Sequence, residues 1–575
     1  MEVVLSRKTG LVMVSEVPNL RVMFDFKKLK NYIIDNAFFY VSLFFLSAFF
    51  LLIFSLWTSP AYHNWYGCDA SFFTMAGRGI TEGWVPYRDF FDLKGPYFFF
   101  LEALGQLLCK GRSGAYIIQV FALFFALIFM IKTCRLFISV KKTGFIVAIF
   151  LFFYASTLWG GNTLEEYALP LNLLVFHLIL KDVSALYTNM DHEISADTSF
   201  INIKNSSALI SGVCFAIILF SKVTVAAPII GLILAVIIYY LKDRRFFDLA
   251  LFLLYAFLGL LIGITPIFIY FYSKGMLSEM LYAVFLFAFK RSVDFGTKFS
   301  VSWELKISGC YFAIIYVLCQ LKTRKCVEAA NYVADVEDVG GIGDRHQLAN
   351  NCPLGDRHHS QNIHRIFTKG SGPNSFMLTS ILLAAVITAL VLHLGDPFIY
   401  YFTTAYPIIM LTFISVFVTY DPLTLFKDWR LDVPIVAFLI CLCYFASHTA
   451  NQLNTVLFDR GNTYYQDYVD EAMEMASLIP EDEQDDVYSI NLDMQWFECN
   501  QMLPCYSYTI NLQFFVDLDP RIEQNIIRKL NNDPPKWIVT GGDIESYLPN
   551  INDVVQFKYK NIYGNSYGSL YILTE

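Results

Sequence analysis

Charged side chains gather in one stretch of an otherwise very apolar chain, between residues 68 and 96. Two hydrophobic runs flank this stretch, and its charges alternate with apolar anchors such as Phe90 and Phe91. A carboxylate can take a proton from a hydroxyl, and lysine and arginine can hold a phosphate. We therefore interpret the stretch as a functional site, with a solvated connection as the alternative. Its charged members are Asp69, Arg78, Glu82, Arg88, Asp89, Asp92 and Lys94.

Other candidate residues lie in three short segments farther along the chain. Glu165 and Glu166 are adjacent carboxylates that either belong to a site or cap the amino end of a helix. Lys222 separates two apolar runs, where it either binds an anion or extends toward the membrane surface. Tyr400 and Tyr401 begin another apolar run, where they either join an aromatic interface belt or line a cavity.

Cysteine and histidine residues give weaker signals. Histidines and Cys352 cluster in the polar segment 321–374, but their spacing fits no metal-binding template, so we predict no metal site there. Cys499 and Cys505 are close in sequence in a region that we expect to meet an oxidising compartment. They are therefore the one plausible disulfide.

The elements that position these residues belong to a polytopic membrane protein with a soluble part attached. The chain has 575 residues, of which 56% are hydrophobic and only 16% charged. A soluble domain averages about 25% charged residues. The formal net charge of −8 argues against nucleic acid as a partner.

Apolar runs predict about eleven transmembrane helices, because about 20 apolar residues span a bilayer. A shorter apolar run at 96–109 predicts an interfacial or re-entrant helix that begins at Pro96. Residues 273–302 predict a helix on the membrane surface. The predicted spans are 37–57, 114–132, 143–159, 167–186, 207–221, 224–241, 248–272, 303–320, 375–393, 398–419 and 433–450.

Lysine and arginine residues are more numerous in the segments that share a side with the amino terminus. The positive-inside rule therefore places residues 1–36 in the cytoplasm. The transmembrane domain follows as 37–451, with a first outer loop at 58–113 and a mobile inner loop at 321–374. An odd number of spans places residues 452–575 outside, and their pattern predicts a small α/β domain.

Within that domain, we expect helices at 465–479 and 521–530 and strands at 487–492 and 537–540. A closing hairpin is expected from 554–559 and 569–573. The domain contains no nucleophile elbow, P-loop or dinucleotide-binding fingerprint. The chemistry is therefore expected in the membrane part.

The sequence GWVPYRDFFDLKGP at 83–96 is similar to a pattern of many bacterial GT-C-fold membrane glycosyltransferases, G-x-x-P-Y-R-D-x-x-D-x-K-G-P. The group includes the protein mannosyltransferases and the lipid A aminoarabinose transferases. An acid soon after the first helix, such as Asp69, and a short outer loop with acids, such as Glu165 and Glu166, also resemble the group. The chain departs from it at Ile399, where a histidine often precedes the tyrosine.

The resemblance implies transfer of a sugar from a polyprenyl-phosphate donor at the outer face, with inversion and direct attack by an acceptor hydroxyl. The base would be Asp69. The partners would be the lipid-linked sugar, a glycan, lipid or protein acceptor, and membrane lipids. The donor phosphate would be bound by Lys94, Arg88 and Lys222, and sugar or acceptor would be bound or oriented by Asp89, Asp92, Glu165, Glu166 and Tyr400.

A divalent metal is compatible with these acids but not required, because the cations can balance the charge of the phosphate. The main alternative function is a transporter or flippase of lipid-linked sugars, although the sequence shows no paired repeat of the kind that transporters contain. A receptor without enzymatic activity would leave the charged stretch unexplained.

Overall fold

The computed structural model describes residues 36–62, 64–188, 201–291, 373–393, 398–419, 446–447, 449–451, 453–454, 463–509 and 512–574. Within them, seven segments are long and apolar enough to cross a membrane, as expected of a multi-pass membrane protein. They are α2 (Ala37–Phe54), α5 (Arg112–Cys134), α6 (Val140–Thr157), α7 (Leu164–Thr188), η2 (Val223–Ala226) with α9 (Ala227–Lys242), α10 (Phe246–Ser273), and η5 (Ile399–Ala405) with α17 (Tyr406–Thr419).

Two shorter apolar helices, α8 (Asn205–Leu219) and α16 (Pro373–His393), pack in the same bundle, against α10 and α9 respectively. Every predicted span therefore coincides with a helix except 303–320 and most of 433–450, which lie outside the described residues. Residues 1–35 and 321–372, the latter nearly all of the predicted inner loop at 321–374, also lie outside them, so the total of eleven spans stays a prediction.

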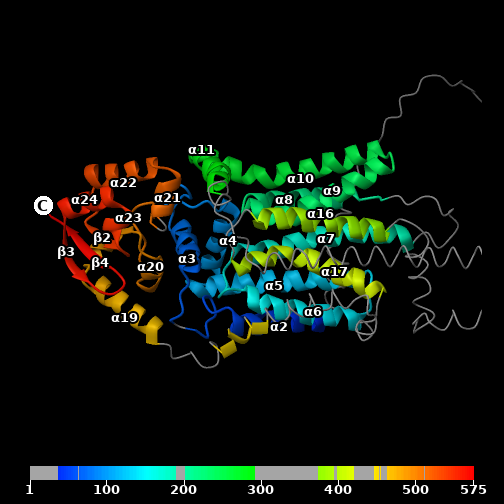
Figure 1. The fold of residues 1–575 in the computed structure, drawn as a ribbon, viewed down its shortest axis with the longest axis horizontal. Helices are drawn as coiled ribbons and strands as arrows, with labels where there is room; N and C mark the ends of the chain where they lie inside the picture. The colour runs from blue at the N-terminus through cyan, green and yellow to red at the C-terminus, as the bar shows by residue number, and fades with distance from the viewer. Residues whose placement is uncertain are drawn as a thin grey trace, which may run out of the picture.

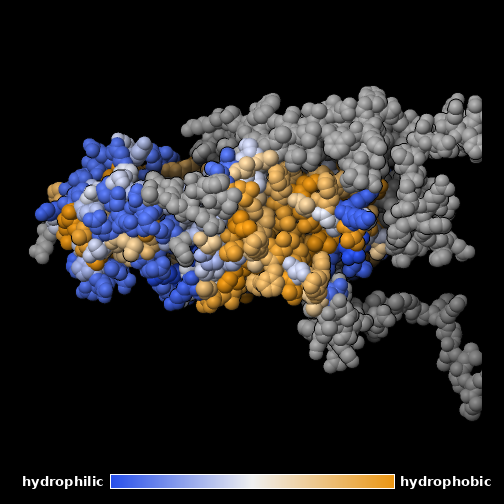
Figure 2. Space-filling model, turned by 90° about the horizontal axis from the view of Figure 1, so that it is seen from below, coloured by the Kyte–Doolittle hydropathy of each residue, from blue (hydrophilic) through white to orange (hydrophobic). Residues whose placement is uncertain are grey.

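The molecule divides into a long helical bundle and a smaller C-terminal domain (Figure 1). Side chains on the bundle form a broad apolar band, whereas the domain surface is mainly hydrophilic (Figure 2). The helices α3 (Cys68–Thr81) and α4 (Pro96–Leu108) lie between the two parts (Figure 1). The segment predicted as the first outer loop, 58–113, therefore contains the layer that joins the helical bundle and the C-terminal domain.

The helix α3 was not expected, because its residues were interpreted as loop. Most of its side chains are buried, from Ala70 to Gly77, between α4 on one side and the C-terminal domain on the other. Gly77 and Gly79 lower the intrinsic helix propensity of this segment, so the helix depends on its packing. In contrast, α4 begins at Pro96 as predicted, with proline in the first turn where its missing N–H is not needed.

A short helical segment follows α10 in the region predicted to form a surface helix. It consists of α11 (Leu277–Leu281) and the π-helix η3 (Tyr282–Phe287), and it continues as α-helix to residue 291. Met280 and Phe287 are buried, whereas Leu286 and Phe289 are exposed. This two-faced pattern is the one expected of a helix that packs on protein with one side only.

The C-terminal domain contains a four-stranded mixed sheet with strand order β1-β2-β4-β3. β1 (Val487–Ile490) pairs in parallel with β2 (Trp537–Thr540), and β4 (Ser569–Leu573) pairs antiparallel with both β2 and β3 (Tyr559–Gly564). The other elements are α19 (Thr463–Ser477), η8 (Glu481–Asp486), α20 (Gln495–Cys499), α21 (Leu512–Leu518), α22 (Arg521–Asn532), α23 (Ile544–Tyr547) and α24 (Pro549–Lys558).

The expected helices, the first two strands and the last strand of this domain are present in the structure. The strand predicted at 554–559 is wrong, because residues 549–558 form α24 and the strand begins only at Tyr559. Pro549 starts this helix, and the buried residues Ile551, Asn552 and Val555 lie on one helical face. The domain is α/β as predicted, with its sheet covered by more helices than the sequence indicated.

Candidate active site between the bundle and the C-terminal domain

Asp69 lies in the first turn of α3 and is partly exposed. In the described part of the chain, its carboxylate makes no hydrogen bond or ion pair. Cys68, the residue before it, donates its thiol hydrogen to Asp493 of the C-terminal domain at 3.1 Å. Asp69 is therefore a carboxylate at the boundary between the bundle and the C-terminal domain that has no hydrogen-bond or ion-pair partner among the described residues, and we call it unengaged in this sense.

Lys94 follows in the loop between α3 and α4, residues 82–95, which we call loop 82–95. Its Nζ lies 3.2 Å from Oδ2 of Asp92 and 4.7 Å from the ring centroid of Phe73. The Lys94 side chain is 17% exposed. Burial lowers the pKa of Lys94, but the carboxylates of Asp92 and Asp69 raise it, and the net pKa lies above its ordinary value. Lys94 is therefore a mostly buried cation that stays charged.

Lys222 is a second, mostly buried cation at the turn before η2. Its Nζ lies 2.5 Å from Oε1 of Glu165 and 3.9 Å from the ring centroid of Tyr401. Burial lowers the pKa of Lys222, whereas Glu165 and Tyr401 raise it, so the net pKa is raised. Lys94 acts against this shift, which means that the two ammonium groups are close enough to repel each other.

Backbone hydrogen bonds join the segments that carry the two lysines. The N–H of Gly95 donates to the Ser221 carbonyl at 2.6 Å, and the N–H of Tyr97 donates to the Phe220 carbonyl at 3.3 Å. A Cβ atom on Gly95 would lie 2.0 Å from the Phe220 oxygen. Only glycine allows this close approach, so the glycine in the motif has a direct structural reason.

The adjacent acids Glu165 and Glu166 separate into two roles. Glu166 accepts the Thr163 N–H and hydroxyl at 2.9 Å each and the Gln119 amide at 2.8 Å. Because Thr163 directly precedes α7, this is the arrangement of a helix cap. The other acid, Glu165, is the partner of Lys222. The structure thus places Glu165 with the cations and Glu166 within the scaffold.

Arg88 and Asp89 lie apart from the two lysines. The guanidinium of Arg88 donates to both oxygens of Asp89, and Asp89 also accepts the N–H of Val85. The Arg88 side chain is 51% exposed, and Tyr270 of α10 lies near enough to influence its pKa. The structure therefore brings together Asp69, Asp92, Lys94, Glu165 and Lys222, but not the pair formed by Arg88 and Asp89.

Tyr400 and Tyr401 both lie near Lys222, in η5. The ring centroid of Tyr400 is 5.9 Å from the Lys222 Nζ, and its ring stacks on Phe398. The closer ring, that of Tyr401, is almost fully buried. The sequence pointed to Tyr400 as the site residue, whereas the structure assigns the stronger cation–π contact to its neighbour.

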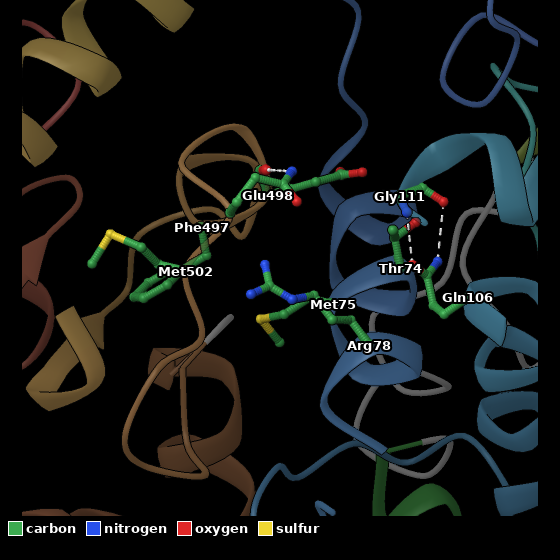
Figure 3. Close-up of a pocket in the computed structure, with 9 residues that line it drawn as sticks. Thr74, Met75, Arg78, Gln106, Gly111, Phe497, Glu498 and Met502 are labelled. Carbon is green, nitrogen blue, oxygen red and sulfur yellow. Dashed lines mark hydrogen bonds between the residues drawn. The ribbon is translucent and has the colours of Figure 1, made fainter. Parts of the chain in front are cut away.

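Contacts from the C-terminal domain were missed entirely by sequence reasoning. Asp493 bonds to Cys68, and the carbonyl of Ser507 accepts the N–H of Phe91 in loop 82–95. A small pocket also lies where α3 faces α20, and Figure 3 shows side chains of Thr74 and Glu498 on its two sides. These contacts join residues about 400 positions apart, and nothing local in the sequence marks them.

Buried carboxyl groups lie on both sides of this same junction. Glu102 of α4 and Glu498 of α20 each have one buried oxygen that makes no hydrogen bond within the described residues. Burial raises the pKa of Glu102 to about 8, and Glu498 adds to the effect. Burial also raises the pKa of Glu498, against the lowering effect of Arg112. Glu102 is therefore largely neutral at pH 7.

The disulfide predicted between Cys499 and Cys505 is absent from the structure, where both are free thiols. Cys499 ends α20 and donates its thiol hydrogen to the Trp496 carbonyl, whereas the Cys505 N–H bonds to the Val487 carbonyl beside β1. The two residues belong to different elements, and their pairing stays a prediction.

The acids compatible with a divalent metal already have partners. Asp92 and Glu165 pair with lysines, Asp89 pairs with Arg88, and Glu166 caps α7. No group of three His, Cys, Asp or Glu side chains in the described ranges is arranged to hold a metal ion. Asp92 and Glu165 are therefore placed to orient the two lysines.

Neither a protein-family model nor a curated protein matches the sequence. The structure is similar to ArnT from Cupriavidus metallidurans bound to undecaprenyl phosphate, with 14% identity and a TM-score of 0.46 over 92% of this chain and 97% of that chain. It is also similar to the apo oligosaccharyltransferase of Archaeoglobus fulgidus, with 14% identity and a TM-score of 0.44 over 93% of this chain and 74% of that chain. Both are GT-C-fold membrane glycosyltransferases. The function is inferred below from the side chains of the site.

Proposed function

We propose that the chain is a membrane glycosyltransferase that transfers a sugar from a polyprenyl-phosphate donor to a hydroxyl acceptor at the outer face of the membrane. The observation that carries the proposal is a pair of mostly buried lysines, Lys94 and Lys222, each paired with a carboxylate and near the unengaged carboxylate of Asp69. This set supplies the fixed positive charge and the base that such a transfer needs. The motif at 83–96 resembles that of enzymes with this chemistry.

The base in this mechanism is Asp69. The acceptor oxygen forms a bond to the anomeric carbon while the bond between that carbon and the donor phosphate oxygen breaks. The hydroxyl proton passes to the Asp69 carboxylate, and the departing phosphate keeps the electron pair of the broken bond. The configuration inverts because the acceptor attacks from the face opposite the phosphate. An unengaged carboxylate at the domain boundary suits this role, since the acceptor can reach it.

The two lysines would stabilise the negative charge that develops on the leaving phosphate. Because Lys94 and Lys222 are buried and already oriented by Asp92 and Glu165, they lose little by reorganising during the reaction. Repulsion between two close ammonium groups is relieved when a phosphate lies between them. Arg88 is a weaker candidate, since its guanidinium is occupied by Asp89.

The decisive experiment is a transfer assay with the purified full chain in nanodiscs. Lipid extracts of cells with and without the chain are compared by mass spectrometry to identify the accumulated lipid-linked sugar. That sugar, synthesised on a polyprenyl phosphate, is then offered with glycan, lipid and peptide acceptors. We expect a glycosylated product and an equal amount of free polyprenyl phosphate.

The same preparation separates this function from transport. In sealed vesicles, a flippase would move the intact lipid-linked sugar from one leaflet to the other without cleaving it. Movement of intact donor together with no product from any acceptor would contradict the proposed transferase function.

A further inference from the structure

Phe91 is the point where loop 82–95 meets the C-terminal domain. Its buried ring contacts Tyr508 and Phe515 of that domain, with ring centroids 5.3 and 5.6 Å apart, and Phe287 of η3 at 5.3 Å. Its N–H donates a 3.0 Å hydrogen bond to the Ser507 carbonyl. Three regions that are distant in sequence therefore meet on one side chain of the loop.

The loop is held on its other side by the membrane bundle. Gly95 and Tyr97 donate their N–H groups to the carbonyls of Ser221 and Phe220, directly before Lys222. Between this anchor and Phe91 lie only Asp92, Leu93 and Lys94. The ion pair of Asp92 and Lys94 thus lies between two fixed points. One is the pair of hydrogen bonds to the bundle, which we call the bundle anchor, and the other is the contact of Phe91 with the C-terminal domain, which we call the domain anchor. Loss of either one frees one end of the segment.

A polar contact strengthens the domain anchor beside Phe287. Tyr282 of η3 donates its hydroxyl hydrogen to Asp519, and Arg521 donates to the Tyr282 hydroxyl at 3.0 Å and to Asp519 at 2.6 Å. Asp519 is almost fully buried, and hydrogen bonds from Arg521 hold its pKa well below the ordinary value. The contact of the C-terminal domain with η3 and loop 82–95 around Phe91 therefore combines apolar packing with charged hydrogen bonds.

We propose that Phe91 is a positioning residue through which the C-terminal domain sets the conformation of loop 82–95, and thereby the affinity of Lys94 for the donor phosphate. The domain thus acts on donor binding without touching the donor. The identity of the ligand rests on the proposed function, whereas the mechanical link between domain and loop does not.

Hydrogen exchange tests the link without any ligand. The variant Phe515→Ala removes one ring from the cluster at a site outside the loop, and Phe557→Ala is its control, since Phe557 lies in the same domain and is 85% exposed. We expect amides in peptides covering residues 86–95 to exchange on the order of tenfold faster in Phe515→Ala, and at the wild-type rate in Phe557→Ala. Unchanged exchange in a folded Phe515→Ala variant would overturn the proposal.

Donor affinity then tests the consequence. Synthetic polyprenyl phosphate is titrated into the full chain in nanodiscs, with wild type, Phe91→Ala, Phe515→Ala and the double variant. We expect each single variant to bind on the order of tenfold more weakly, and the double variant no more weakly than Phe91→Ala, because both changes break the same contact. A loss of folded protein alone would lower the number of binding sites and leave their affinity unchanged, which would also contradict the proposal.

The two tests separate failure of the link from failure of the proposed function. If wild type does not bind polyprenyl phosphate but loop exchange still depends on Phe515, the proposed ligand is wrong and the link stands. If wild type binds the lipid phosphate and neither exchange nor affinity responds to Phe515→Ala, the link is wrong and the proposed function stands.

Discussion

At the scale of single residues, the site is a set of charges whose partners decide their roles. Lys222 is buried, yet it keeps a raised pKa because Glu165 faces it. Glu166, one position later, contributes only to the scaffold. The sequence left open whether these two acids cap a helix or form a site. In the structure Glu166 caps α7, and Glu165 pairs with Lys222.

The variant Glu165→Gln should therefore weaken donor binding in a pH-dependent way. Without the carboxylate, burial is left to lower the pKa of Lys222, so the lysine loses its proton at a lower pH than in wild type. We expect affinity for polyprenyl phosphate to decline at a lower pH in the variant, as measured by titration between pH 6 and 10. Identical pH profiles would remove Glu165 from this role.

The neighbouring variant Glu166→Ala should act on stability. It leaves the Gln119 amide and the Thr163 N–H without their acceptor, and a lost buried hydrogen-bond partner costs about 1–3 kcal/mol. We expect a lower melting temperature in detergent and nearly unchanged donor affinity per folded molecule. A wild-type melting temperature with impaired binding would show that Glu166 belongs to the site after all.

At the scale of elements, the close approach of loop 82–95 to the turn before η2 brings the lysines together. The variant Gly95→Ala would place a methyl group 2.0 Å from the Phe220 oxygen, so the loop must shift and its hydrogen bond to Ser221 must lengthen. We expect a stability loss of roughly 1–3 kcal/mol together with weaker donor binding.

Gly144→Ala is the matched control, because a Cβ there meets nothing within 4 Å and alanine favours the helix. Melting temperature and donor affinity are measured for both variants. If Gly95→Ala behaved like Gly144→Ala in both measurements, the close approach would not be what joins the two lysines.

The elements predicted well are those with a strong local pattern. Apolar length identified the described spans, and Pro96 marked the start of α4. α3 was missed because it is buried on several faces, and α24 was partly mistaken for a strand because Val554–Tyr559 alternates locally while Pro549 already commits the segment to a helix. Tertiary packing explains the first miss, whereas the second came from a window too short to include Pro549.

At the scale of the whole molecule, the membrane bundle and the C-terminal domain meet over α3, α4 and loop 82–95 (Figure 1). The sequence predicted both parts and the residues of the first outer loop, but not their contact. Pairs such as Cys68 with Asp493 and Phe91 with Phe515 depend on how the bundle and the domain pack together. No hydrophobic periodicity or residue spacing in the sequence predicts this packing.

The carboxyl groups buried at this junction should make stability depend on pH. Burial first, and then Glu498, hold the pKa of Glu102 near 8, whereas an unfolded chain ionises it near 4.3. Asn162, Tyr167 and Glu166 complete its polar surroundings. Between these two pKa values the folded protein binds more protons than the unfolded chain, so this contribution to stability falls as the pH rises and levels off above about 8.

Replacing Glu102 with glutamine removes the titrating group. We expect the wild type to lose stability relative to Glu102→Gln by roughly 2–5 kcal/mol between pH 5 and pH 9, measured by thermal unfolding in detergent. Parallel pH profiles of wild type and variant would show that Glu102 is not protonated in the folded protein.

The central claim is that an unengaged Asp69 removes the acceptor proton while Lys94 binds the donor phosphate. The most direct measurement compares Asp69→Asn with Lys94→Ala in one experiment that records both sugar transfer and donor affinity in nanodiscs. Asparagine keeps the size of the side chain but cannot accept a proton at neutral pH, so transfer should fall about 10²- to 10⁴-fold while donor affinity stays. Lys94→Ala should lose donor affinity as well as transfer. Near-normal transfer by Asp69→Asn, or full donor affinity in Lys94→Ala, would contradict the account.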